Sequence, residues 1–218
     1  FIGSLQWILS LGRFDTACAV MSLSSFHVVP RRGHLEQLKR VCGHLMKMQH
    51  FGIQFRTHEP DFSDLKTVEQ DWFSGCGDVV EALPLNMPKA LGKGVQLTHH
   101  VDANLLHDVL TGRSVTACLH FANATPIDWH SKKQATVETA MHSLEFVAAW
   151  TCIEQIIDLS NTLHCLGVEV REKSLMFGDN KSVVNSASTV HSKLHKHHNA
   201  LFCHHGREAI PSRCVDVN

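Results

Sequence analysis

Residues 95–122 of the chain read VQLTHHVDANLLHDVLTGRSVTACLHFA. Apolar residues occupy alternate positions twice in this stretch, on either side of a turn signal at Thr111-Gly112: Val95, Leu97, Val101 and Ala103, then Val115, Ala117, Leu119 and Phe121. A period of two residues is typical of strands with one apolar and one polar face. The stretch therefore predicts two consecutive strands separated by a turn.

The residues that follow predict further strands and helices. We expect a third strand over 126–130, a long helix from about 137 to 165, a short strand over 174–177 and a last helix from about 193 to 210. Three strands, a helix, a strand and more helices predict an α/β layer fold.

The first part of the chain has helical rather than strand periodicity. Residues 34–48 place six apolar side chains on one helical face: Leu35, Leu38, Val41, Cys42, Leu45 and Met46. Ile53 and Phe55 then alternate with polar residues as in a short strand. From Glu59 to Gly94 the periodicity fades and prolines and glycines accumulate, which indicates a linker or long loop. We expect three parts: a helical segment over 1–66, a linker over 67–94 and an α/β domain over 95–218.

Composition limits the classes of function. The chain has 20 Lys and Arg against 21 Asp and Glu, so any nucleic-acid binding must use a local patch rather than the overall charge. The eight cysteines include no closely spaced pair, which argues against a disulfide framework and favours thiols in a reducing compartment. No apolar run approaches the roughly 18 residues of a membrane span, and no secretory signal heads the chain. We expect an intracellular protein of the cytoplasm or nucleus that is not secreted.

Three carboxylates stand out by their positions. Asp102 lies within the first predicted strand, Asp179 directly after the strand 174–177, and Glu145 on the apolar face of the long predicted helix. Each has a purely structural alternative: Asp102 at a strand edge, Asp179 as a helix N-cap, and Glu145 paired with a lysine at the rim. As a set they can converge above one edge of a sheet. Clustered carboxylates repel one another and bind hard divalent cations such as Mg²⁺ or Mn²⁺.

The segments that contain these residues share a pattern and an order. They are Val101-Asp102-Ala103-Asn104, then DWHSKKQ at 128–134, LEFVAA at 144–149, and Phe177-Gly178-Asp179-Asn180. Nearer the N-terminus stand GRFD at 12–15, LSSF at 23–26 and GHLE at 33–36. The first set resembles the ribonuclease H signatures of copia-type retrotransposon polyproteins, and the second resembles the reverse transcriptase tail that precedes them. The resemblance implies a ribonuclease H-like mixed sheet with flanking helices, preceded by a small, mainly helical segment.

The resemblance also implies an activity, namely a divalent-metal-dependent endonuclease that cleaves the RNA strand of RNA/DNA hybrids. It makes Asp102, Glu145 and Asp179 the catalytic ligands of Mg²⁺ or Mn²⁺ in a two-metal site. The resemblance places the family's fourth carboxylate in a terminal helix, and a nearer candidate, an aspartate of many copia elements, corresponds to Asn199 here. Because Asn199 is neutral, the second ion would bind more weakly. Lys132 and Lys133 are candidate phosphate contacts, although the sequence favours a solvated turn there. The implied partners are an RNA/DNA hybrid and the rest of a reverse transcriptase polyprotein.

A catalytically inactive domain, decayed or co-opted as a binding or structural module, is the alternative. The family's terminal helix would begin beyond Asn218, so we expect a C-terminally truncated domain. The chain has 18 histidines and no tyrosine, a composition that single-base transitions in a decaying copy would produce. A third option, zinc or nickel binding, is left by the histidine clusters at 99–100, 195–198 and 204–205. Exposed histidines without a cysteine partner are usually idle, however.

Overall fold

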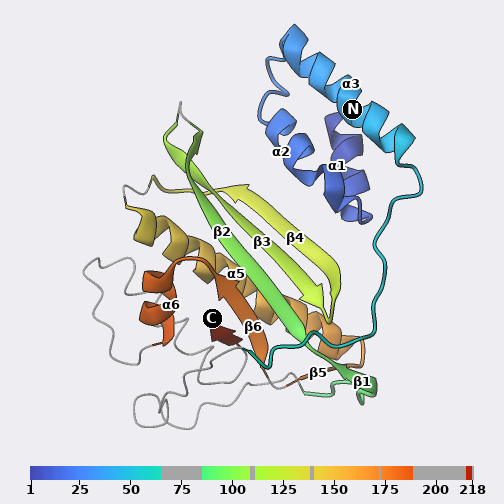
Figure 1. The fold of residues 1–218 in the computed structure, drawn as a ribbon, viewed down its shortest axis with the longest axis vertical. Helices are drawn as coiled ribbons and strands as arrows, with labels where there is room; N and C mark the ends of the chain where they lie inside the picture. The colour runs from blue at the N-terminus through green and yellow to red at the C-terminus, as the bar shows by residue number, and fades with distance from the viewer. Residues whose placement is uncertain (65–84, 109–110, 138–139, 172, 189–214, 218) are drawn as a thin grey trace.

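The computed structural model describes residues 1–64, 85–108, 111–137, 140–171, 173–188 and 215–217 (Figure 1). Five strands form its main sheet, in the spatial order β4 (Thr125–Lys133), β3 (Arg113–Ala122), β2 (Leu97–Asp108), β6 (Ser174–Gly178) and β7 (Val215–Val217). The β2–β3 and β3–β4 pairs are antiparallel, whereas the β2–β6 and β6–β7 pairs are parallel. The sheet is therefore mixed. Two short strands, β1 (Leu91–Val95) and β5 (Val168–Val170), form a separate parallel pair.

Helix α5 (Met141–Cys165) covers one face of the main sheet (Figure 1). Side chains alternate along a strand, and Val101, Ala103 and Leu105 of β2 are among those that pack against this helix. The helix ends just before Gly167, whose φ of 72° is a left-handed conformation that glycine adopts without strain. The core beneath α5 consists of Cys118, Phe146, Ala149, Cys152, Ile153, Ile156, Met176 and Val183.

A small helical segment precedes the sheet. It contains α1 (Ile2–Ser10), the 3-10 helix η1 (Phe14–Thr16), α2 (Ala17–Ser24) and α3 (Arg32–Lys47). Leu5, Leu9, Val20, Leu23 and Val41 form its core. Trp129 of β4 packs against this core, and its ring meets that of Phe14 edge-on, with 6.5 Å between centroids. The segment therefore contacts the sheet at β4, and the fold class is the expected one: an α/β mixed sheet with flanking helices, preceded by a small helical segment.

Some predicted elements are not found. Residues 53–56 are not a strand, because a side-chain contact replaces the backbone ladder: the Arg56 N–H donates to Thr125 Oγ1 at 2.7 Å. On α3 the predicted apolar face is only partly used. Val41 is buried, but Leu35 and Met46 are 52% and 78% exposed, because in the described structure α3 packs mainly against α2. The predicted helix over 193–210 lies outside the described residues.

Other elements were not predicted or are longer than predicted. β1 starts at Leu91, inside the stretch predicted as a linker, and its glycines Gly92 and Gly94 hide the strand signal. β5 and α6 (Lys181–Ser188) are short and were also missed. Among the described helices, none has both the length and the apolar character that a membrane crossing requires.

Two histidines form a buried pair between β2, β3 and α5. His99 and His120 face each other across the strands, are 0% and 1% exposed, and their Nδ1 atoms lie 2.7 Å apart. His120 Nε2 lies 2.9 Å from Gln155 Oε1, which can only accept, so His120 donates there and its Nδ1 accepts from His99. Burial, together with the nearby His120 and His100, lowers the pKa of His99 to about 3. His99 is thus a neutral core residue rather than part of a surface metal site.

This pair predicts a loss of stability in mild acid. The folded pKa of His99 lies below the unfolded value of about 6.5, so the unfolded chain binds the extra proton and stability falls as the pH drops below about 6.5. Between about pH 7.5 and pH 5 the free energy of unfolding should fall by about 2 kcal/mol through this residue. Urea unfolding of the wild type and of His99→Gln at both pH values measures the effect. An equal loss in the two proteins would contradict it.

Candidate metal centre

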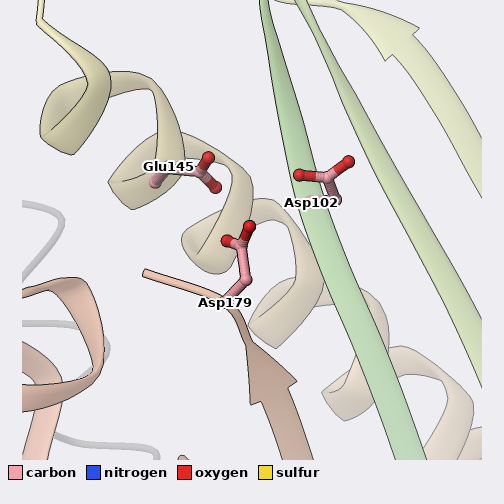
Figure 2. A group of neighbouring side chains, drawn as sticks. All are labelled: Asp102, Glu145 and Asp179. Atoms are coloured by element: carbon pink, nitrogen blue, oxygen red, sulfur yellow. The ribbon is translucent and has the colours of Figure 1, made fainter. Parts of the chain in front are cut away.

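Three carboxylates from three different elements meet beside the C-terminal end of β6, next to the middle of β2 (Figure 2). Each of Asp102, Glu145 and Asp179 offers a carboxylate oxygen, and these oxygens all lie within 4.8 Å of one another. The register explains the meeting of the two aspartates. β2 and β6 run parallel, and Val101 lies opposite Gly178. The residue that follows each of them is an aspartate, so Asp102 and Asp179 come to lie side by side. Glu145 reaches them from the second turn of α5.

Asp102 lies on the central strand of the sheet, between β3 and β6. The alternative of a position at a strand edge is therefore wrong. The side chain is exposed, and its Oδ1 accepts a hydrogen bond from the backbone N–H of Ala103 at 2.8 Å. This bond orients the carboxylate while it remains open to solvent.

Asp179 follows the last residue of β6 and is exposed. The helix N-cap, which was the structural alternative for Asp179, is its neighbour Asn180. Asn180 Oδ1 accepts from the N–H groups of Ser182 at 3.0 Å and Val183 at 3.4 Å, at the start of α6. Because Asn180 caps the helix, the Asp179 carboxylate is available to the cluster.

Glu145 is the buried member of the cluster, with 7% of its surface exposed. It lies next to Leu144, which packs with Ala148 against Ala103. Burial, followed by the negative charges of Asp179 and Asp102, raises the pKa of Glu145 to about 7. Keeping this carboxylate ionised near neutral pH therefore needs a nearby positive charge.

The described structure supplies no such charge from its own side chains. None of the ion pairs among the described residues includes Asp102, Glu145 or Asp179. Three oxygen ligands that converge without an ion pair to any described Lys, Arg or His match the preference of hard divalent cations such as Mg²⁺ and Mn²⁺. The residues present thus fit the ions that the sequence predicts.

Gln134 holds the start of α5 in place, and its role was missed in the sequence. It is 5% exposed, and its Nε2 donates to the carbonyl of Leu144 at 2.9 Å and to Thr116 Oγ1 at 3.1 Å. The bond to Leu144 fixes the backbone one residue before Glu145. A polar residue between a strand and a helix is the only sequence signal for this contact, and it is as common in solvated loops.

The other predicted site residues lie apart from the cluster or outside the described chain. Lys132 and Lys133 are part of strand β4, so the expected solvated turn is wrong. β4 extends three residues beyond the predicted strand because it pairs with β3 as far as Lys133. Lys133 Nζ donates to Asp108 Oδ2 at 2.7 Å. Asn199 lies outside the described residues.

Comparison with known proteins gives a limited set of likenesses. No family model matches the chain. It is 24% identical over 159 residues to the secreted RxLR effector protein 161 of Plasmopara viticola, which covers 73% of this chain and 88% of that protein. That protein is named as secreted, so the expectation of an intracellular, non-secreted protein is wrong on this comparison. The expectation rested on widely spaced cysteines and on the first residues of the given sequence, and neither specifies a compartment.

Similar solved structures are ribonuclease H proteins. The N-terminal ribonuclease H domain of a Mycobacterium tuberculosis protein, solved as a fusion with maltose-binding protein, has a TM-score of 0.41 at 12% identity, over 57% of this chain and 80% of that one. A ribonuclease H1 isolated from compost by a metagenomic approach has a TM-score of 0.41 at 13% identity, over 56% and 82%. The same enzyme in complex with an RNA/DNA hybrid gives 0.42 at 12%, over 56% and 83%. Likeness at this level says nothing about substrate or activity.

The raised pKa of Glu145 predicts how pH and divalent ions act on stability. Between about pH 4.5 and 7 the folded protein holds a proton on Glu145 that the unfolded chain releases, so stability falls as the pH rises through this window. At about pH 8 with a chelator present, Glu145→Gln should therefore be more stable than the wild type. Adding Mg²⁺ or Mn²⁺ should raise the melting temperature of the wild type more than that of the variant.

Thermal unfolding followed by circular dichroism measures both effects. Glu154→Gln is the matched control, because Glu154 is an exposed glutamate on the same helix. It should behave as the wild type does. Equal responses of all three proteins to the ions would show that Glu145 does not take part in a metal site.

Proposed function

We propose that this protein is a divalent-metal-dependent endonuclease that cleaves the RNA strand of RNA/DNA hybrids. The observation that carries the proposal is the convergence of Asp102, Glu145 and Asp179 within 4.8 Å, with Glu145 buried. A buried carboxylate beside two others is costly in a protein without a function for it. The resemblance of the surrounding segments to copia-type ribonuclease H signatures supplies the substrate class.

The chain's own residues have distinct parts in this proposal. Asp102 and Asp179 present their carboxylates at the exposed mouth of the cluster, where a phosphodiester of the substrate can approach. Glu145 forms its buried floor, and Gln134 fixes the helix that carries it. Mg²⁺ or Mn²⁺ bound to such a set activates a water and stabilises the leaving oxygen of the phosphodiester.

The remaining elements of the proposal come from the sequence. Lys132 and Lys133 contact phosphates of the substrate, and Asn199 serves as a neutral fourth ligand that leaves the second ion weakly held. The chain derives from a copia-type polyprotein, with a reverse transcriptase tail over 1–66, a linker over 67–94 and the nuclease domain over 95–218. The rest of such a polyprotein is its proposed protein partner.

The activity is tested directly with a hybrid whose RNA strand carries an end label. With Mg²⁺ or Mn²⁺ we expect cleavage of the RNA strand, but not of the DNA strand or of single-stranded RNA. Glu145→Gln should lower the rate about 100-fold or more, the scale seen when one preorganised electrostatic group is removed from a catalytic site. Gel analysis of the labelled products over time gives the rates.

The exposed Glu154→Gln on the same helix is the control and should retain the wild-type rate. Circular dichroism establishes that each protein is folded. Absence of cleavage by a folded wild type, with both ions, would contradict the proposal. It would leave the alternative, a ribonuclease H-fold module without catalysis.

A further inference from the structure

A groove runs between helix α2 and the face of the sheet that α5 does not cover. Its volume is about 600 Å³, within the range of ligand-binding pockets. On the sheet side it is lined by Asp102 and Ala117, and further along by Ser131, Lys132 and Lys133. The groove thus begins at one of the three clustered carboxylates and extends to Lys133, near the end of β4.

The strand register explains why Asp102, Ala117, Ser131 and Lys133 share one face, whereas Lys132 pairs with Thr116 and points to the face that α5 covers. Asp102 pairs with Ala117, which pairs with Ser131, and Val115 pairs with Lys133. Directly paired residues point to the same side of a sheet. Trp129 lies on this same face by alternation, and it is the residue that packs against the helical segment. The contact at Trp129 therefore sets α2 at a distance from the sheet and leaves the groove open beside it.

Helix α2 offers a face of mixed polarity to the groove and an apolar face to its own core. Val20 and Leu23 are buried in the core of the helical segment. The residues that line the groove recur one turn apart on the opposite face: Ala17, Cys18, Met21, Ser22, Ser24 and Ser25. Ser22 and Ser25 thus line the groove opposite Ser131 and Lys133 of the sheet, while the Ser24 hydroxyl donates to the carbonyl of Met21. Hydroxyl and ammonium donors above a partly apolar floor match a nucleic-acid strand, with its phosphates and its sugars and bases.

We propose that this groove holds a stretch of nucleic-acid strand next to the scissile phosphodiester, so that the helical segment forms one wall of the substrate site. The inference rests on the proposed nuclease function. It assigns to α2 a part in substrate binding that the carboxylate cluster alone does not require. The side chains of Ser25 and Ser131, one on each wall, contact backbone phosphates.

The exposed thiols of the chain provide a test without any substitution in the groove. Cys18 is exposed and lines the groove, whereas Cys165 is exposed at the far end of α5. The Glu145→Gln variant is incubated with an RNA/DNA hybrid and alkylated with iodoacetamide, and peptide mass spectrometry gives the rate at each cysteine. When the concentration of the hybrid is about ten times its Kd, the alkylation of Cys18 should slow about tenfold. The alkylation of Cys165 should be unchanged.

A charge placed in the groove provides the second test. Ser25→Glu should raise the Kd of the hybrid about fivefold or more, because the carboxylate repels phosphate. Ser4→Glu, on the exposed side of α1 and outside the groove, introduces the same charge and should leave the Kd unchanged. Fluorescence anisotropy of a labelled hybrid measures both.

The outcomes separate this inference from the function on which it rests. Cleavage by the wild type together with unprotected Cys18 and an unaffected Ser25→Glu would overturn the groove and leave the nuclease standing. Failure of the folded protein to bind or cut the hybrid at all would overturn both. Protection of Cys18 and Cys165 alike would indicate a general coating of the surface and would also overturn the groove.

Discussion

The position of β2 between β3 and β6 is the constraint on which the rest of the structure depends. It pairs antiparallel on one side and parallel on the other, and the parallel register brings Asp102 beside Asp179. A shift of one residue would turn Asp102 toward α5 and Ala103 toward the groove. The hydrophobic packing of Val101 and Ala103 under α5 opposes such a shift. The geometry of the acidic cluster is thus fixed by apolar residues that have no part in its chemistry.

The parts of the fold that could be predicted are those with strong periodicity. β2, β3 and α5 each have a long alternating or helical pattern, and they carry Asp102 and Glu145. The short β1 and β5 were not predictable, because glycine and a length of three to five residues leave no pattern. The convergence of the carboxylates was expected only as a possibility. The register between β2 and β6 decides whether the carboxylates meet. Register depends on two segments that are distant in the sequence, so neither segment alone specifies it.

Two contacts of the site could not be read from the chain at all. Gln134 bonds to the backbone beside Glu145, and Asn180 rather than Asp179 caps the next helix. Both bonds are made by ordinary polar residues. Such residues stand in the same kind of sequence context when they lie in a solvated loop, so the sequence does not reveal the bond. The groove beside Asp102 was equally hidden, since it arises where the helical segment meets Trp129, a contact between parts of the chain more than a hundred residues apart.

The place of Lys132 and Lys133 in β4 has a consequence apart from any ligand. Among the described strands, β4 is the last on its side of the main sheet. A strand with one free side is a template on which another molecule's strand can assemble, and natural proteins deter this with lysines, prolines and irregular register. β4 has all three: the two lysines, Pro126, and a break in the pairing with β3 near Phe121. Neutral residues at both lysine positions would therefore favour aggregation of the folded protein.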